Sequence, residues 1–273
     1  MSFLSSLRGL GRTLAADFAL GRIGAGPGWF SLLHYRGRIA HRRRQAPPVS
    51  RVRLRLGARR LDLRLTSAHL GAFLGIFLDR EYDCGKIAHA PPRTVLDLGA
   101  NIGMGSLFLA TLFPNAEFLC VEPDPRNLAF LRDNLALNGV HATICEGAVA
   151  AAAGTMNLRV NDDPTCSALE SSPMHATQGT VRVNVSTIPA LLKDAGWQKI
   201  DLLKIDIEGS EDELLSRDNG WLRDVGSILM EIHPNTTPER IDSYLQPFGF
   251  VLERSSYGRE PVYLAYRPAS GMG

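Results

Sequence analysis

The chain is poor in cysteine and has no long apolar run. Its 273 residues include four cysteines, Cys84, Cys120, Cys145 and Cys166. Their spacing contains no C-x-x-C pair, and four are too few for a disulfide framework, so we expect free thiols, a reducing compartment and no zinc site built on cysteine. No segment approaches the roughly 18–20 consecutive apolar residues of a membrane span. These absences favour a globular protein of the cytoplasm.

Acidic residues are almost missing from the first 60 positions. This part holds 13 arginines, no lysine and one acid, Asp17, for a formal charge of +12, whereas residues 61–273 hold 17 basic and 27 acidic residues, for −10. Such a segment either contacts phosphates of nucleic acid or anionic lipid, or pairs with the acidic surface of its own domain. The run of Arg36, Arg38 and Arg42–Arg44 lacks the aromatic interleaving that stacks bases, which makes nucleic acid an improbable partner. Peripheral membrane contact stays open.

We expect residues 1–90 to form a basic cap region of helix, Arg-rich segment, hairpin and helix. Apolar residues at helical spacing predict an amphipathic helix over residues 2–20, better suited to packing on the protein's own core than to a membrane. Alternating residues at 51–56 and 60–65 predict a hairpin, and residues 67–80 a helix. Pro91-Pro92 then marks a boundary.

Residues 91–268 are expected to form a second domain with an α/β fold. Short apolar runs predict strands at about 94–98, 116–122, 142–146, 200–205, 226–232, 249–254 and 261–266, and helices near 104–112, 125–137, 187–195, 210–217 and 237–246. The alternation predicts a doubly wound, Rossmann-like sheet of seven strands. Because no helix separates the last two strands, they should form an antiparallel hairpin at one edge. Residues 154–186 are an insertion that would act as a lid.

The strongest motif for a cofactor is a glycine turn between a predicted strand and a helix. It runs from Asp97 through Gly99 to Gly103, where the absent Cβ atoms allow close backbone approach and Asp97 can orient a cation or hydroxyl. Glycines at 99, 103 and 105 do not follow the G-x-G-x-x-G pattern that binds a pyrophosphate, so a dinucleotide is disfavoured.

An acid follows the next strand. Glu122, before Pro123, is placed to accept hydrogen bonds from both hydroxyls of a ribose, because a carboxylate presents two oxygens. A ligand with a ribose, no pyrophosphate and a cationic tail fits, and S-adenosylmethionine is one. Glu146, after the third strand, either accepts from an adenine amino group or is a solvated acid.

The chain resembles the FkbM-type methyltransferases, a family with the class I S-adenosylmethionine-dependent fold. The motifs that carry the resemblance are Asp97–Gly103, Val121–Pro123 with Leu131, Asn134 and Asn138, Val183–Thr187, Leu203–Glu211 and Glu231–His233. The resemblance covers roughly residues 75–255. It implies a cofactor site of Asp97, Gly99, Ala100, Asn101, Gly103, Glu122, Pro123 and Glu146. It also implies an acceptor hydroxyl on a sugar, a glycolipid or a secondary metabolite.

Four polar residues follow the fourth and fifth strands, where an open α/β sheet binds its ligands. Asp206 and Glu208 form one pair and Glu231 and His233 the other, and the i, i+2 spacing puts each pair on one face. Three interpretations are open. His233 acts as general base, the group binds Mg²⁺ or a similar cation, or Asp206 and Glu208 cap the helix that begins at Ser210.

These observations predict a methyltransferase that uses S-adenosylmethionine to methylate oxygen. Two alternatives remain: an N- or C-methyltransferase of the same fold, which needs no base for a hydroxyl, and a non-catalytic binding module that keeps the fold. The expected partner is a small molecule or a glycan. The acceptor and the oligomeric state do not follow from the residues.

Overall fold

The N-terminal part of the protein is a helix and a hairpin packed on the rest of the chain. The computed structural model describes residues 21, 29–43, 45–84, 90–160, 167–169, 179–258 and 260–268, and the helix expected over residues 2–20 lies outside them. The elements in order are α2 (Trp29–Arg42), β1 (Ser50–Leu56), β2 (Arg59–Leu65), the 3-10 helix η1 (Ser67–His69) and α3 (Leu70–Phe77). The hairpin and the helix after it are therefore as predicted, apart from a helix end three residues earlier.

Helix α2 occupies a segment that the sequence analysis treated only as Arg-rich. Its buried residues are Phe30, Leu33, Gly37 and Ala40, so one face packs inward although the helix carries many charges. A Cβ at Gly37 would lie 2.0 Å from the hydroxyl oxygen of Ser67, so only glycine allows the helix to approach the chain before α3 so closely.

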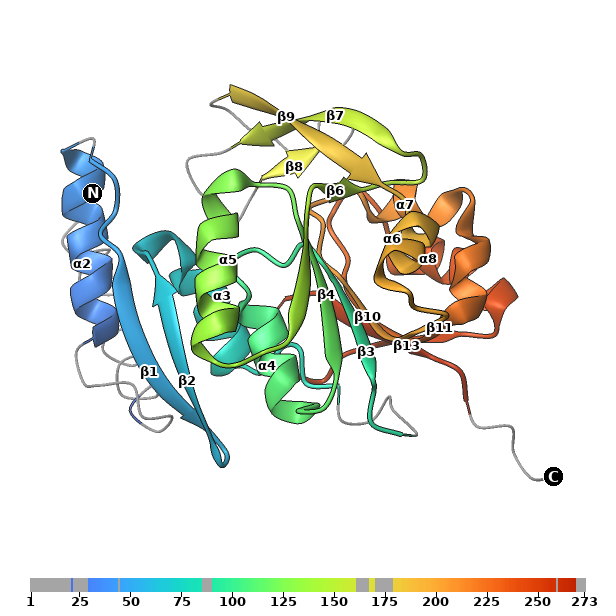
Figure 1. The fold of residues 1–273 in the computed structure, drawn as a ribbon, viewed down its shortest axis with the longest axis horizontal. Coiled ribbons are helices and arrows are strands. Elements are labelled where there is room, and N and C mark those ends of the chain that lie inside the picture. Colours follow the sequence, from blue (N-terminus) through green and yellow to red (C-terminus); the bar gives the residue numbers. More distant parts are fainter. Residues whose placement is uncertain are drawn as a thin grey trace.

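The central sheet has seven strands in the order β12-β13-β11-β10-β3-β4-β5 (Figure 1). They are β3 (Thr94–Leu98), β4 (Glu117–Glu122), β5 (Ala142–Glu146), β10 (Ile200–Ile205), β11 (Val225–Glu231), β12 (Val251–Arg254) and β13 (Val262–Tyr266). All pairs are parallel except those of β13 with β11 and β12. The predicted doubly wound sheet with one antiparallel edge hairpin is confirmed.

Helices cover both faces of this sheet. They are α4 (Met104–Leu112), α5 (Pro125–Leu137), α6 (Ile188–Ala195), α7 (Glu211–Ser216), α8 (Pro238–Leu245), and the 3-10 helices η3 (Asn219–Asp224) and η4 (Gln246–Phe248). Successive residues of β10 point to opposite faces: Leu202 joins the core under α4 and α5, and Leu203 joins the core under α6, α7 and α8. No helix among the described residues is long and apolar enough to cross a membrane.

The first of these cores also contains α2 and the hairpin. Phe30, Leu54 and Leu63 lie in the same cluster of buried side chains as Val95 and Phe118 of the central sheet. The basic extension is thus packed on the sheet's domain through a shared core. A domain boundary at residue 90 stays a prediction.

The inserted segment contributes a small second sheet. It consists of β6 (Ala148–Val149), β7 (Gly154–Val160), β8 (Ala168–Leu169) and β9 (Gly179–Ser186), in the order β6-β9-β7-β8. The two extended runs expected in the insertion are β7 and β9. Figure 1 draws this sheet at the top of the molecule, and its own small apolar core includes Leu158, Leu169 and Val183.

Two asparagines of α5 attach the hairpin to the helix. Asn138 accepts from the Asp62 N–H (2.9 Å) and donates to its carbonyl (2.8 Å), and Asn134 does the same with Arg64 (2.7 and 3.0 Å). The side chains therefore pair with β2 as a neighbouring strand would. Asn134 also donates to the carbonyl of Ile102 at 2.8 Å, which links the hairpin to the glycine turn.

Candidate active site

A pocket opens at the carboxyl ends of β3, β4 and β10, beside the small sheet. Its volume is about 570 Å³, including space open to solvent. It is lined by Gly99, Asn101, Val121, Glu122, Pro123, Asn127, Ala148, Val149, Leu158, Ser167, Leu169, Asp206, Ile207 and Glu208. Its lining mixes apolar and polar side chains, as binding sites for small molecules do, and this position is where open α/β sheets bind their ligands.

Gly99 is required by the protein's own backbone. It has φ +76°, and a Cβ there would lie 1.7 Å from the carbonyl oxygen of Asp206. The N–H groups of Gly99 and Ala100 both donate to the carbonyl of Val121 at 3.0 Å, and the Asp206 N–H donates to Leu98 at 3.1 Å. The sequence analysis attributed the missing Cβ to ligand approach. The structure adds that Gly99 lets two strand ends meet at the pocket wall.

Glu122 lies on the pocket wall and is already hydrogen bonded. One oxygen accepts from the Asn101 N–H at 2.7 Å, and the other from the Asp124 N–H (2.9 Å) and the Asn127 amide (3.2 Å). Burial raises the pKa of Glu122 to about 7, although these hydrogen bonds oppose the shift. Because a carboxylate offers about four acceptor positions, the three contacts leave about one, on Oε2.

Asp97 does not line the pocket. It is fully buried, accepts from the Ser106 hydroxyl at 2.5 Å and pairs with the Lys204 ammonium at 2.9 Å. Lys204 also donates to the Gly99 carbonyl at 3.1 Å, and although burial lowers its pKa, the charge of Asp97 raises it more. The cation that Asp97 binds is thus Lys204 of β10, which also donates a hydrogen bond to the glycine turn.

Three further residues predicted to bind the cofactor lie outside the pocket lining. Ala100 is buried in the turn, and Gly103 has φ +86°, with space for a Cβ blocked by Leu131 of α5 at 2.9 Å. Glu146 is exposed and forms an ion pair with Arg132. Its exposure agrees with the interpretation of this residue as a solvated acid. Asn101 and Pro123 do line the pocket.

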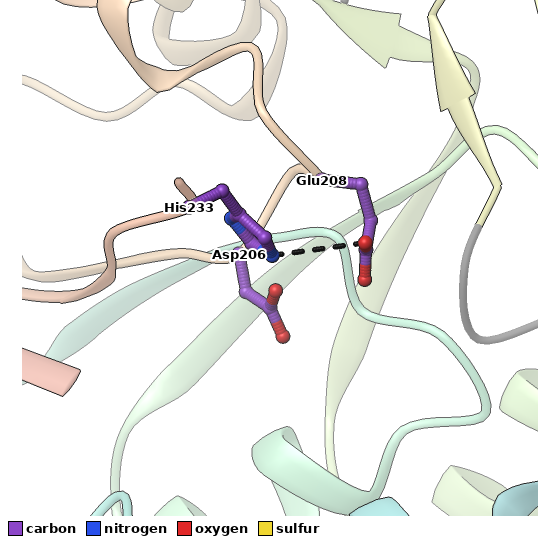
Figure 2. Close-up of side chains that lie close together, drawn as sticks. All are labelled: Asp206, Glu208 and His233. Atoms are coloured by element: carbon purple, nitrogen blue, oxygen red, sulfur yellow. Dashed lines mark ion pairs between the residues drawn. The ribbon is translucent and has the colours of Figure 1, made fainter. Parts of the chain in front are cut away.

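Asp206, Glu208 and His233 come together at one side of the pocket (Figure 2). One ligand atom from each lies within 4.8 Å of the others, and the His233 Nε2 is 3.6 Å from Glu208. Glu231, the fourth predicted residue, lies 3.8 Å from the same nitrogen. The structure therefore unites all four residues that follow β10 and β11.

His233 is held in its protonated form by its neighbours. Burial lowers its pKa, but the hydrogen bond to Glu211 at 2.9 Å and the charges of Glu211, Asp206 and Glu208 raise it to about 10. An imidazolium has no lone pair for a proton. The resting state is thus a poor general base, contrary to the first interpretation of this residue.

The helix-capping interpretation of Asp206 and Glu208 stays a prediction. The Ile207 and Gly209 N–H groups before α7 donate to Glu211, at 3.4 and 3.2 Å. Glu211 thus has two contacts. It accepts hydrogen bonds from the loop before α7, in which Glu208 has φ +52°, and it orients His233. The sequence analysis gave it no role, since its partner lies 22 residues away.

Two residues from the chain before the central sheet complete this side of the site. Tyr82 is buried and donates to Asp206 Oδ2 at 2.8 Å, and its ring lies against the Lys204 ammonium, 5.2 Å away. Glu81 is buried too, and desolvation together with the charge of Asp206 raises its pKa to about 8. Burial and Asp206 likewise raise the pKa of Glu231. The sequence analysis assigned no site role to either Glu81 or Tyr82.

The sheet order, the glycine turn after β3, the acid at the end of β4 and the reversed strand β13 together define a class I methyltransferase. The model of the methyltransferase FkbM domain matches residues 97–252, which is more than half of the chain. The protein belongs to this family of S-adenosylmethionine-dependent methyltransferases.

Two relatives share about four fifths of their length with this chain. The methyltransferase sdnD of Sordaria araneosa is 30% identical over 213 residues, which are 66% of this chain and 81% of the relative. The 31-O-demethyl-FK506 methyltransferase FkbM of Streptomyces tacrolimicus is 26% identical over 210 residues, 64% and 80% of the two chains. The crystal structure of the methyltransferase FkbM of Methylobacillus flagellatus KT has 18% identity and a TM-score of 0.47, over 68% of this chain and 46% of that one.

Proposed function

We propose that this methyltransferase acts on a hydroxyl oxygen of a small molecule or glycan, such as a sugar, a glycolipid or a secondary metabolite, in the cytoplasm. The observation that carries the proposal is the place of Asp206, which lines the same pocket as Gly99 and Glu122. A proton acceptor beside the cofactor pocket is what transfer to a hydroxyl needs. The name of the Streptomyces relative, a 31-O-demethyl-FK506 methyltransferase, supports oxygen as the acceptor.

The pocket residues fit S-adenosylmethionine. Glu122 offers its remaining acceptor position to a ribose hydroxyl, and Val149, Leu158 and Leu169 offer an apolar wall to the adenine. The carboxylate of Glu208, which also lines the pocket, favours a cationic group. When bound, the cofactor supplies a methyl group activated by a positive sulfur. The small sheet excludes water from that side of the pocket.

Asp206 is the proton acceptor in this proposal. Tyr82 and Lys204 both contact its Oδ2, at 2.8 and 3.8 Å, and thereby orient the carboxylate. An acceptor hydroxyl would donate to Oδ1, and its proton would move there as the C–O bond forms and the methyl–sulfur bond of the cofactor breaks. His233 is then a positioning group: as an imidazolium it lies 3.8 Å from Glu231 and 3.6 Å from Glu208, whose charge it offsets.

A divalent cation between Asp206, Glu208 and His233 is the other way to activate a hydroxyl. The spacing of these ligand atoms within 4.8 Å supports it, whereas the raised pKa of His233 opposes it, because a metal binds neutral imidazole. Activity that survives treatment with EDTA contradicts the metal. Activity lost with EDTA and restored by Mg²⁺ contradicts the metal-free route.

Binding and turnover of the Asp206→Asn variant test the proposal. Calorimetry with S-adenosylmethionine should give the affinity of the unchanged protein, whereas the mass gain of one methylene unit on acceptors should disappear. Asp224→Asn, an exposed acid of η3, is the matched control. Unchanged turnover in Asp206→Asn favours an N- or C-methyltransferase, and absence of cofactor binding by the unchanged protein favours a non-catalytic module.

A further inference from the structure

The basic extension turns its arginines away from the core. On β1, Val52 and Leu54 are buried, while Arg51, Arg53 and Arg55 between and beside them are exposed. On α2, one side of the helix is buried and the remaining surface carries exposed residues. We use the name arginine face for the exposed arginines of α2, of the residue after it, of β1 and of the start of β2. They are Arg36, Arg38, Arg42, Arg43, Arg51, Arg53, Arg55, Arg59 and Arg60.

Few acids neutralise this face. Between residues 29 and 65 the sequence contains one, Asp62, which accepts from Arg51 at 3.1 Å and from Arg53 at 3.3 Å. Both arginines remain more than half exposed. Among the described residues, the alternative weighed from the sequence, pairing with the acidic surface of the protein's own domain, is seen for Arg64 of β2 with Asp133 of α5. A large positive charge is left facing solvent.

Apolar side chains stand among the arginines. Leu32 and Tyr35 of α2 are 57% and 63% exposed, and Val49, just before β1, is 48% exposed. Leu32, Tyr35 and Arg36 lie at i, i+3 and i+4, so they share one side of the helix. Exposed leucine and tyrosine next to arginines match the interfacial region of a bilayer, where apolar side chains enter the acyl boundary and guanidinium groups reach phosphates.

We propose that the arginine face, with Leu32 and Tyr35, docks on a lipid surface that carries anionic phosphate headgroups. Charge complementarity carries the proposal, because residues 61–273 have the opposite formal charge and direct the basic end toward such a surface. Figure 1 places α2 and β1 at one end of the molecule, and α6 and α8 toward the other. Nucleic acid fits less well, because Tyr35 is the sole strongly exposed aromatic of α2 and β1 and no stacking platform accompanies it.

Sedimentation of the full chain with vesicles tests the proposal. The protein should bind vesicles of phosphatidylcholine mixed with phosphatidylglycerol and should not bind phosphatidylcholine alone. Raising the salt concentration should weaken binding, since exposed charges are screened within about 8 Å at physiological ionic strength. Changing Arg38, Arg42 and Arg55 to Gln should lower affinity roughly a hundredfold, at about fivefold for each arginine.

A control with the same charge change separates a specific face from net charge. Lys193, Arg217 and Arg254 are exposed residues outside the arginine face, and their change to Gln should leave binding nearly intact. The double variant Leu32→Ser, Tyr35→Ser should lose the vesicle binding that remains at high salt concentration. Thermal melting confirms that each variant is folded. Equal losses in both triple variants, no binding to anionic vesicles, or displacement from them by duplex DNA or RNA overturns the proposal.

Discussion

The Tyr82 hydroxyl donates to Asp206 Oδ2 at 2.8 Å, across 124 residues of sequence. Tyr82 precedes the central sheet, whereas Asp206 directly follows its fourth strand along the chain and lines the pocket. The bond therefore ties the cap region directly to the residue that we propose as proton acceptor.

Tyr82→Phe should slow turnover without changing cofactor affinity. The phenyl ring keeps the packing against Lys204 but loses the hydrogen bond that orients Asp206, and a bond to a charged group contributes about 1.5–3 kcal/mol. We expect kcat to fall about tenfold or more, with the dissociation constant of S-adenosylmethionine unchanged by calorimetry. Tyr257→Phe, at an exposed tyrosine, is the control. A fall in cofactor affinity instead would place Tyr82 in the cofactor site.

The strands were predictable because each signal was local. Apolar alternation and turn residues predicted every strand of the central sheet with ends at most two residues from those observed. Helix α2 was missed because its arginines obscured a buried stripe of only four residues, one of them Gly37. The pattern of apolar residues indicates which face of an element is buried. A charged outer face, as on α2, does not prevent a helix from forming.

The site was predictable only in part, because its electrostatics depend on distant residues. The spacing placed Asp206, Glu208, Glu231 and His233 at one sheet edge, where they lie. It could not reveal that Glu211 and the carboxylates keep His233 protonated, or that Glu146 pairs with Arg132. Those contacts form when α5 and α7 pack against the sheet, and the spacing of residues along the chain does not predict this packing.

Glu122→Gln should weaken cofactor binding, and Glu146→Gln should not. The two carboxylates are paired in register at the ends of β4 and β5, yet only Glu122 lines the pocket. Loss of a charged acceptor for a ribose hydroxyl corresponds to about 1–3 kcal/mol, or roughly tenfold to a hundredfold in the dissociation constant. Calorimetry of both variants measures the difference. Equal affinities would show that the ribose lies elsewhere.

The stability of the protein should fall as the pH rises above about 5. The pKa of Glu81 is raised from 4.5 to about 8 in the folded state, so the folded protein binds a proton that the unfolded chain releases between these values. The slope of the unfolding free energy with pH is then negative over that window. Glu122, whose pKa is raised to about 7, acts in the same direction. Thermal melting between about pH 5 and about pH 9 should record the decline.

The Glu81→Gln variant isolates the contribution of this residue. A neutral amide of similar shape should flatten the decline and make the variant more stable than the unchanged protein above about pH 8. Glu117→Gln, at an exposed acid at the start of β4, should keep the original slope. An unaltered slope in Glu81→Gln would mean that Glu81 is ionised in the folded protein at neutral pH.

Asn134→Ala should destabilise the fold and loosen the cofactor turn together. The side chain is fully buried and makes three hydrogen bonds, two with Arg64 of the hairpin and one with Ile102 of the turn. Leaving these backbone groups unpaired costs about 2–4 kcal/mol. Asn138→Ala, which loses the two bonds to Asp62 at a half-buried position, should cost about 1 kcal/mol. Urea unfolding measures both losses, and calorimetry should find weaker S-adenosylmethionine binding in Asn134→Ala alone, because only Asn134 contacts the turn. Equal effects of the two substitutions on cofactor binding would mean that the turn holds its conformation without the hairpin.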